Sequence, residues 1–389
     1  MVHPFRADRY ARLVMRHSLA TLPLFLFAAA APAQHTASQA AIARFSAQIA
    51  KDVAEDGIGA ISAAVVVGDQ VQWARGYGWA DVARRWPADA HTIYRIGSIS
   101  KSMTAVAMAR LIQRGELKLD DKVVAHFPPF AKLEGSEGRA EVITLRQLAS
   151  HTAGLSREPQ LRGAAAGPIE NWEDKILASI EKTSFRADPG DSYAYSNIGY
   201  GILGLTVSRA AGKPFMELVE EEVFEPLGMT SSTFVIDDRL APRLSAGYAP
   251  RRDGTVNAEQ SALEHAGRGY KVPNGGVYST VGDLCKFIAG MTGSMSTEYL
   301  SPATRTEVLA NQTPEGDRSK YGLGFSISNL GNGVTARGHG GSVSGYNAHI
   351  IFDPESKIGV AILRNYSGGS TNLGGAARTL LGELIAAEK

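Results

Sequence analysis

Apolar positions near the start of the chain follow first a helical and then a strand pattern. Within residues 37–56 the apolar side chains recur every three or four positions, which predicts an amphipathic helix. Residues 61–67 are then almost continuously apolar, as in a buried strand, and residues 71–77 alternate between apolar and polar. Because Gly68-Asp69 between these runs favours a tight turn, the pattern predicts a β-hairpin.

Strand patterns return only near the end of the chain. Residues 324–328 and 334–338 flank an Asn-Leu-Gly-Asn-Gly turn, and residues 348–352 and 358–363 flank an Asp-Pro-Glu-Ser-Lys turn. These arrangements predict two further hairpins. Residues 376–388 are apolar at helical spacing and predict a closing helix.

The middle of the chain, residues 117–310, carries little strand signal. Short helical patterns occur there between loops with glycine and proline, at residues 145–149, 172–180, 202–211, 215–223 and 281–291. Strands at both ends predict an α+β fold of the α/β sandwich type, with one antiparallel sheet built from both chain ends and flanked by helices. We expect a sheet lobe at about 37–97 and 311–389, a mostly helical lobe inserted at about 98–310, and an active site in the cleft between them.

One stretch within this pattern carries both a nucleophile and a base. Ser98 and Lys101 stand three residues apart at the start of a helix predicted to end near Gly115, so their side chains share one helical face. A serine hydroxyl needs a neighbouring base to become a good nucleophile, and the unpaired N–H groups at a helix start can stabilise negative charge. The spacing alone is weak evidence, because Ser179 and Lys182 repeat it.

Two further clusters offer polar groups of catalytic type. Tyr195 and Asn197 are two residues apart in a loop, where a phenol and an amide can face the same way. His339-Gly-Gly-Ser342 places small residues after a histidine, which lets the backbone approach a ligand closely. The structural alternatives are that Tyr195 is simply a half-buried aromatic residue and that His339-Gly-Gly-Ser342 is a plain tight turn. His151 is expected to be a polar loop residue that supports the cleft.

Composition narrows the classes of function. The chain has 40 basic and 39 acidic residues, so its net charge of +1 gives no support for nucleic acid or an anionic membrane surface as partner. The nine histidines show no metal-ligand spacing, and there is no Gly-rich phosphate loop, so neither a metal nor another cofactor is expected. No G-x-S-x-G nucleophile elbow occurs, and a Ser-His-Asp triad has no positive support. The single cysteine, Cys285, rules out an internal disulfide.

The N-terminus has the order of a secretory signal peptide. Four arginines between residues 6 and 16 precede an apolar run at 19–31 and then Ala31-Pro-Ala33. We expect a signal peptide over residues 1–33, cleavage after Ala33, and a periplasmic or secreted domain over residues 34–389. An uncleaved anchor is the alternative, but the run is short for a membrane span and is interrupted by Pro23. No stable membrane span is therefore expected after cleavage.

In their order and separations, the clusters resemble the serine β-lactamase and penicillin-binding protein-like family. The resemblance is greatest to its branch of class C β-lactamases, D-Ala-D-Ala carboxypeptidases and related esterases, and it runs from about residue 60 to the C-terminus. The motifs that carry it are Ser98-Ile-Ser-Lys101 for the family's Ser-x-x-Lys, Tyr195-Ser-Asn197 for its Tyr-x-Asn, and His339-Gly-Gly341 for its Lys-Thr-Gly.

The resemblance implies that Ser98 attacks a carbonyl carbon and forms an acyl-enzyme. Lys101 and Tyr195 would share the proton transfer, and either one could be the base. A neighbouring cation favours ionisation of Tyr195 while burial favours a neutral Lys101, so we expect the two groups to titrate together. The backbone N–H groups of Ser98 and Ser342 would form an oxyanion hole. The residues expected to bind the substrate are Asn197, His339, Gly341, Ser342 and Asn365.

The third motif departs from the family pattern. A lysine there carries a fixed positive charge, whereas His339 is mostly neutral near pH 7, and Gly340 lacks a hydroxyl. Because one charged hydrogen bond contributes about 1.5–3 kcal/mol, efficient β-lactam hydrolysis is not expected unless Ser342 and Asn365 compensate. We therefore expect an exported serine hydrolase of small esters or amides, including D-amino-acid peptides. The alternatives are a class C-like β-lactamase and a non-catalytic scaffold or ligand-binding protein of the same fold.

Overall fold

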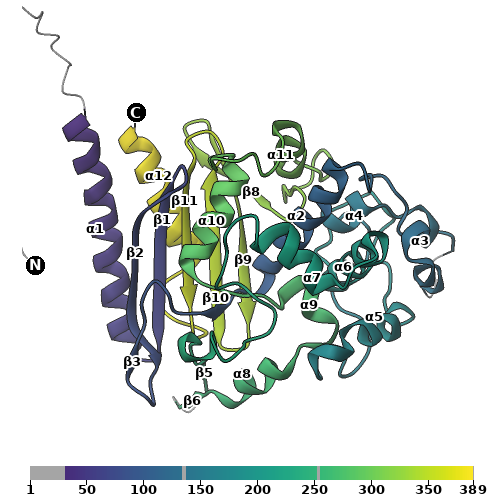
Figure 1. The fold of residues 1–389 in the computed structure, drawn as a ribbon, viewed down its shortest axis with the longest axis horizontal. Helices are drawn as coiled ribbons and strands as arrows, with labels where there is room; N and C mark the ends of the chain where they lie inside the picture. The colour runs from purple at the N-terminus through teal and green to yellow at the C-terminus, as the bar shows by residue number, and fades with distance from the viewer. Residues whose placement is uncertain (1–30, 134–136, 252–254, 389) are drawn as a thin grey trace, which may run out of the picture.

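A computed structural model of the chain describes residues 31–133, 137–251 and 255–388. Its centre is a seven-stranded sheet in the order β3-β2-β1-β11-β10-β9-β8, in which every neighbouring pair is antiparallel (Figure 1). The strands are β1 (Ala60–Val67), β2 (Gln70–Asp81), β3 (Trp86–Pro87), β8 (Ser326–Gly331), β9 (Val334–Val343), β10 (Tyr346–Asp353) and β11 (Ile358–Arg364).

The two ends of the chain meet at β1 and β11. These strands pair from Ile61 opposite Arg364 to Val67 opposite Ile358. Both lie in the middle of the sheet with nearly all their side chains buried, which explains their continuous apolar sequences. The predicted α+β fold, with one antiparallel sheet built from both chain ends, is confirmed.

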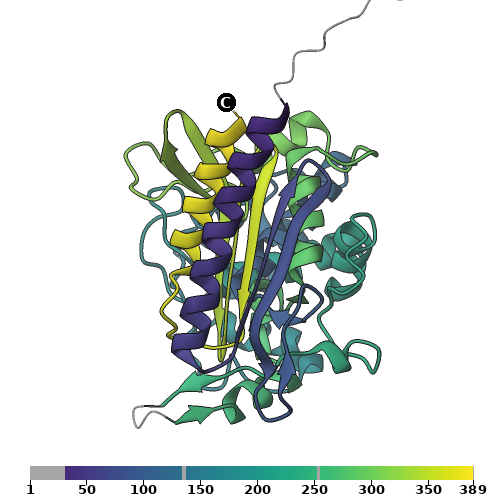
Figure 2. The same cartoon turned by 90° about the vertical axis from the view of Figure 1, so that its left-hand side faces the viewer.

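Helices cover both faces of the sheet. Helices α1 (Ala31–Asp56) and α12 (Leu373–Glu388) lie side by side on one face (Figure 2), in a core shared with Val65 and Ile362. Helix α10 (Val281–Thr292) packs on the other face, in a core shared with Ala64 and Leu363. Successive strand residues point to opposite faces, so alternate residues of β1 and β11 divide between the two cores.

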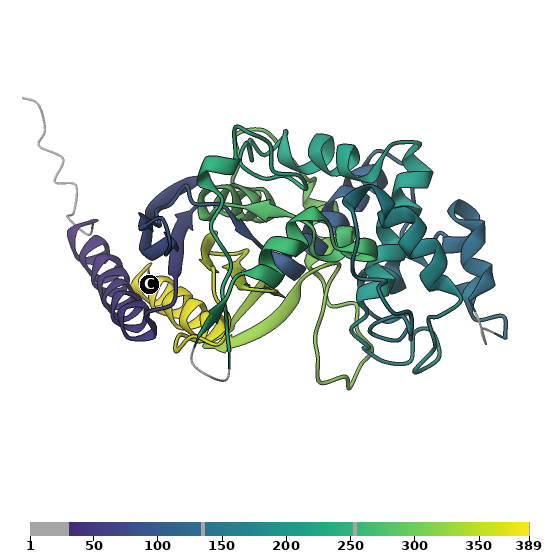
Figure 3. The ribbon, with the colours of Figure 1, turned by 90° about the horizontal axis from the view of Figure 1, so that it is seen from below.

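The remaining helices gather at the end of the molecule opposite α1 (Figure 3). They are α2 (Ser100–Gln113), α3 (Val123–His126), α4 (Leu145–Ala149), α5 (Trp172–Ile180), α6 (Asn197–Ala211), α7 (Phe215–Val219), α9 (Val272–Gly275) and α11 (Pro302–Leu309). Short elements beside the sheet are β4 (Tyr94–Arg95), β5 (Ala249–Pro250), β6 (Val256–Asn257), α8 (Glu259–Leu263) and β7 (Tyr278–Ser279). Helices α2, α6 and α9 contact one another at the centre of this lobe.

Helix α6 begins earlier than the apolar pattern predicts, at Asn197 rather than at residue 202. Its first residue is preceded by Ser196, whose hydroxyl accepts a hydrogen bond from the Gly199 N–H at 2.9 Å. The first turn includes Gly199 and Gly201, which hide the helical spacing of apolar residues. The sequence pattern therefore predicts a loop at Asn197, whereas Asn197 opens a buried helix.

Two other elements differ from expectation. Strand β9 continues to Val343, so His339 and Ser342 lie inside a strand rather than in a turn beside one. Helix α10 falls within the predicted helical lobe of residues 98–310 but packs on β1 and β11, so the sheet layer takes in residues before 311.

The predicted signal peptide, residues 1–33, falls outside the described residues except for its last three, which belong to α1. Across the three described stretches, no helix combines the length and apolarity needed to cross a bilayer.

Candidate active site

Ser98 lies in a tight turn that packs against β9. The turn, residues Gly97–Ile99, is a single 3-10 turn directly before α2. Gly97 has a φ of +52°, and a Cβ placed on it would lie 2.8 Å from the backbone nitrogen of Ser342. A Cβ on Gly341 would lie 1.9 Å from the carbonyl oxygen of Ile96 and 3.2 Å from the backbone nitrogen of Ser98. The two glycines thus bring the N–H groups of Ser98 and Ser342 close together.

Lys101 is fully buried one helical turn after Ser98. Its Nζ lies 3.2 Å from Ser98 Oγ, and it donates hydrogen bonds to Asn197 Oδ1 at 2.8 Å and to the Asn274 carbonyl at 3.1 Å. Burial, together with the positive charge of Lys271, lowers the pKa of Lys101 well below its usual value. The amine beside the Ser98 hydroxyl is therefore suited to accept a proton near neutral pH.

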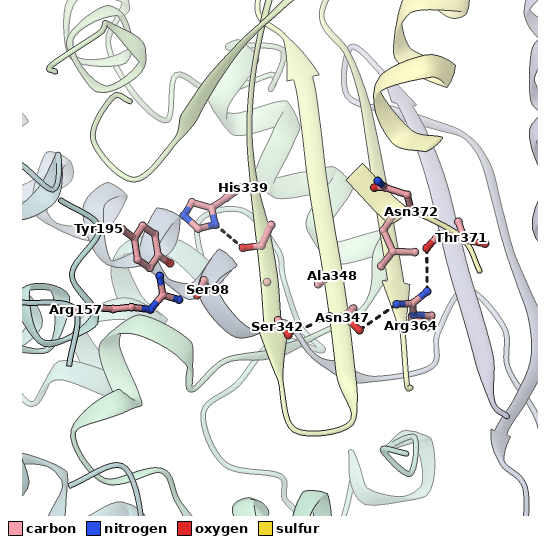
Figure 4. A pocket seen from close by; sticks show the side chains of 13 residues that line it. Ser98, Arg157, Tyr195, His339, Ser342, Asn347, Ala348, Arg364, Thr371 and Asn372 are labelled. Carbon is pink, nitrogen blue, oxygen red and sulfur yellow. Dashed lines mark hydrogen bonds between the residues drawn. The ribbon is translucent and has the colours of Figure 1, made fainter. Parts of the chain in front are cut away.

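The phenol of Tyr195 faces Ser98 from the helical lobe (Figure 4). Burial raises the pKa of Tyr195 to about 12, although the Ser98 hydrogen bond and the charge of Arg157 lower it. Lys101 Nζ lies 4.8 Å from the centre of the Tyr195 ring. Burial outweighs the neighbouring cations expected to favour ionisation of Tyr195, so its phenol is neutral at pH 7.

His151 supports Tyr195 from behind. Its ring centre lies 4.3 Å from that of Tyr195, and its Nδ1 accepts a hydrogen bond from the Ser196 N–H at 3.1 Å. Burial and the charge of Lys101 lower the pKa of His151 well below its usual value, so the ring is neutral. A neutral ring with its Nδ1 occupied by the backbone matches the supporting role expected for His151.

Asn197 lies between Lys101 and an acidic group. Its Oδ1 accepts from Lys101, and its Nδ2 donates to Glu158 Oε1 at 2.6 Å. Glu158 also accepts a hydrogen bond from the Tyr270 hydroxyl and pairs with Lys271 Nζ at 3.2 Å. Because both ends of the Asn197 amide are engaged inside the protein, the structure places it as a partner of Lys101 rather than on the pocket wall.

His339 lines the pocket from β9 as a neutral side chain. Its Nδ1 donates to the Gly340 carbonyl at 2.7 Å, so its Nε2 accepts from the Tyr321 hydroxyl at 2.9 Å. Burial and the charge of Lys101 lower the pKa of His339 to about 3. The third motif therefore carries no positive charge at neutral pH.

A cavity of about 520 Å³ opens above Ser98, where the helical lobe meets the sheet. It is lined by Ser98, Arg157, Tyr195, His339, Gly340, Gly341, Ser342, Asn347, Ala348, Arg364, Thr371, Asn372 and Leu373 (Figure 4). The cavity thus contains five of the residues proposed from the sequence, and Lys101 and Asn197 lie directly behind its wall. Within the described stretches, no group of His, Cys, Asp and Glu side chains could hold a metal ion.

Comparison with known proteins agrees with this arrangement. Residues 45–382, most of the chain, match the family described as Beta-lactamase. The chain belongs to the beta-lactamase family. The resemblance and the fold inferred from the sequence motifs are thereby confirmed.

Proteins similar to this chain include a peptidase, a β-lactamase-like protein and a penicillin-binding protein homologue. The chain is 29% identical to the D-alanyl-D-alanine-carboxypeptidase/endopeptidase AmpH of Escherichia coli K12, over 87% of this chain and 89% of AmpH. It is 30% identical to Beta-lactamase-like protein 4 of Dictyostelium discoideum, over 78% of this chain but only 56% of that protein. The octameric penicillin-binding protein homologue from Pyrococcus abyssi has a similar structure, with 28% identity, a TM-score of 0.75, and coverage of 90% of this chain and 78% of that one.

Like Asn197, Asn365 does not take the substrate-binding position expected for it in this beta-lactamase-family protein. Asn365 is fully buried outside the cavity. Its Oδ1 accepts from the Ala60 N–H at 2.6 Å, and its Nδ2 donates to the carbonyls of Ala80 and Ala246 at 2.9 Å. The amide holds three backbone segments together and has no atom free for a substrate.

Several groups at the site are not among the residues predicted from the sequence. Arg157, Asn347, Arg364 and Asn372 line the cavity, and Glu158 takes part in the contacts around Lys101. Arg364 could have been found from the sequence. It directly precedes Asn365 at the end of a strand, and because neighbouring residues there face opposite sides, Arg364 was the alternative candidate to face the cavity.

Proposed function

We propose that the chain is a serine hydrolase that forms an acyl-enzyme on Ser98. The contact that carries this proposal joins Lys101 Nζ and Ser98 Oγ at 3.2 Å, with the pKa of the buried amine lowered well below its usual value. A neutral amine beside a serine hydroxyl at the bottom of an open cavity is the arrangement that nucleophilic catalysis requires.

The reaction follows from the positions of three side chains. Ser98 Oγ attacks the carbonyl carbon while Lys101 takes the hydroxyl proton, and the N–H groups of Ser98 and Ser342 stabilise the oxyanion. Tyr195, held neutral by burial, gives a proton to the leaving group and regains one through Lys101. Water then attacks the Ser98 ester and gives a proton to Lys101; the Oγ–acyl bond breaks, and Lys101 passes that proton to Ser98 Oγ.

The preferred substrates are small esters or amides, including peptides that end in D-amino acids. Similarity to AmpH over most of both chains supports a carboxypeptidase-like activity. The neutral His339 and the missing hydroxyl at Gly340 favour weak turnover of β-lactams. A β-lactamase is the second candidate, supported by the family match. We also propose export to the periplasm, on the signal-like pattern of residues 1–33.

Covalent labelling tests this function directly. A fluorophosphonate or a fluorescent penicillin is expected to label the wild type but not Ser98→Ala, and intact mass measurement should find one acyl group per chain. Absence of label on the wild type, or equal label on Ser98→Ala, would favour the non-catalytic alternative. Nitrocefin turnover far above that of Ser98→Ala would favour the β-lactamase.

A further inference from the structure

Three polar side chains form a continuous row across the cavity floor. Ser342, Asn347 and Arg364 occupy directly paired positions on β9, β10 and β11. Asn347 Nδ2 donates to Ser342 Oγ at 3.1 Å, and Arg364 Nη2 donates to Asn347 Oδ1 at 3.1 Å (Figure 4). The row begins at Ser342, whose backbone nitrogen lies against Gly97 of the Ser98 turn, and ends on a positive charge.

Arg364 is a buried cation without a carboxylate in direct contact. The residue is 5% exposed, and its three hydrogen bonds go to neutral acceptors, namely Asn347 Oδ1 and the carbonyl oxygens of Tyr366 and Thr371. Among the described residues Asp56 is the nearby negative group, but it acts at longer range and is hydrogen-bonded to Ser370 and Tyr366. A guanidinium has five N–H donors, so two are unused.

The cavity as a whole attracts anions. Among the described residues that line it, Arg157 and Arg364 are charged and none is acidic. Arg157 is on the rim with a side chain 62% exposed, where water screens its charge. Arg364 is more deeply placed, so an anion there would gain more from the contact.

The direction of a bound substrate decides which part meets Arg364. The leaving group must lie near Tyr195 to receive its proton, and the oxyanion lies between the N–H groups of Ser98 and Ser342. Tyr195 and Arg364 are on opposite sides of Ser98 in Figure 4. The acyl chain therefore extends away from Tyr195, over Asn347 and toward Arg364.

We propose that Arg364, held by Asn347, is a subsite for a carboxylate on the acyl part of the substrate. This inference rests on the proposed acyl-enzyme function. The subsite lies two strand spacings from Ser342, or about 9.5 Å across the sheet, so the carboxylate must be several bonds from the scissile carbonyl. A planar guanidinium with unused N–H donors suits a carboxylate, which can accept two of them.

A matched series of substrates tests the subsite. Nitrophenyl half-esters of unbranched dicarboxylic acids of increasing length are compared with the same chains capped as methyl esters. The wild type should prefer the free carboxylate by roughly tenfold or more in kcat/KM, and only at chain lengths that reach Arg364. Arg364→Gln should bring this ratio toward one. Arg337→Gln is the control, because Arg337 on β9 also donates to backbone carbonyls but does not line the cavity.

The outcomes separate this inference from the proposed function. Equal rates for free and capped chains at every length, or a preference that survives in Arg364→Gln, would overturn the subsite even if Ser98 is labelled. Arg364→Lys keeps the positive charge and should therefore retain part of the preference for the free carboxylate. This result would show that the loss of preference in Arg364→Gln is not caused by misfolding. If Ser98 is inert, the subsite can still be tested by calorimetry, which measures the binding of monomethyl dicarboxylates to Ser98→Ala and to the double variant Ser98→Ala/Arg364→Gln. Loss of binding in the double variant supports the subsite. Equal binding by the two proteins, or no binding by either, overturns it.

Discussion

Gly341 leaves no room for a side chain against Ile96, since a Cβ on Gly341 would lie 1.9 Å from the Ile96 carbonyl oxygen. Gly341→Ala should push β9 away from the Ser98 turn and separate the two oxyanion N–H groups. We expect the rate of Ser98 labelling to fall by about a hundredfold, because displacements near 1 Å have costs of this order.

Gly340 provides the matched control for that experiment. A Cβ on Gly340 would lie 3.4 Å from His349 Nδ1, which is an ordinary contact. Gly340→Ala should therefore be labelled at a rate close to that of the wild type. Equal loss in both variants would contradict the proposed geometry.

The acidic limb of the pH–rate profile should report the Lys101 amine. Because burial lowers its pKa, kcat/KM should rise with pH as Lys101 loses its proton and level off below the ordinary lysine value of about 10.4. Lys271→Met removes a positive neighbour and frees Glu158, and both changes raise the pKa of Lys101. The limb should therefore move to higher pH in this variant. A limb that stays in place or moves down would argue against Lys101 as the base.

The motifs around Ser98 were readable from the sequence because their residue types carry chemistry wherever they occur. Ser98, Lys101 and Tyr195 are brought together by α2 and by the loop before α6. The apolar patterns of β1 and β11 likewise marked the centre of the sheet, because a strand buried on both faces has little choice of side chain.

Facing direction was harder to predict than position. At the end of β11 the sequence offers Arg364 and Asn365 side by side, and only the register decides which one reaches the cavity. A shift of one residue exchanges the two faces of a strand. The prediction that Asn365 binds the substrate therefore named the residue that points away from the cavity. The contacts of Glu158 with Asn197 and Lys271 join distant parts of the chain and leave no local pattern.

Asn365 should matter for stability rather than for binding. Asn365→Ala would leave the buried Ala60 N–H and the Ala246 carbonyl without their Asn365 partner, at about 1–3 kcal/mol for each unsatisfied group, while the Ala80 carbonyl keeps its bond from the Ala246 N–H. We expect the free energy of unfolding, measured in urea, to fall by about 3 kcal/mol or more. Asn372→Ala, on the exposed cavity rim, is the control: it removes only the Asn372 Oδ1 that accepts the Gly375 N–H at the start of α12, and should cost about 1 kcal/mol. A fully stable Asn365→Ala variant would show that these contacts contribute little.

Buried histidines should make the fold sensitive to acid. Burial lowers the pKa of His339 to about 3 and that of His349 to about 4, against about 6.5 in the unfolded chain. Between these values the unfolded chain binds more protons, so stability increases with pH and is lost as pH falls from about 6.5 toward 4. Each histidine contributes a slope of up to about 1.4 kcal/mol per pH unit. Urea unfolding at several pH values should show a smaller slope for His349→Gln than for the wild type, and no such decrease for the exposed His91→Gln.

Restoring a hydroxyl to the third motif should improve β-lactam turnover. The cavity has room at Gly340, and a serine there would offer a hydrogen bond to the carboxylate of nitrocefin beside the neutral His339. A charged hydrogen bond of about 1.5–3 kcal/mol corresponds to a gain of tenfold or more in kcat/KM. Gly340→Ser should therefore hydrolyse nitrocefin at least tenfold faster than Gly340→Ala, which has the same Cβ without the hydroxyl. If the two variants are equally slow, the missing hydroxyl is not what limits β-lactam hydrolysis, and the neutral charge of His339 becomes the cause to test.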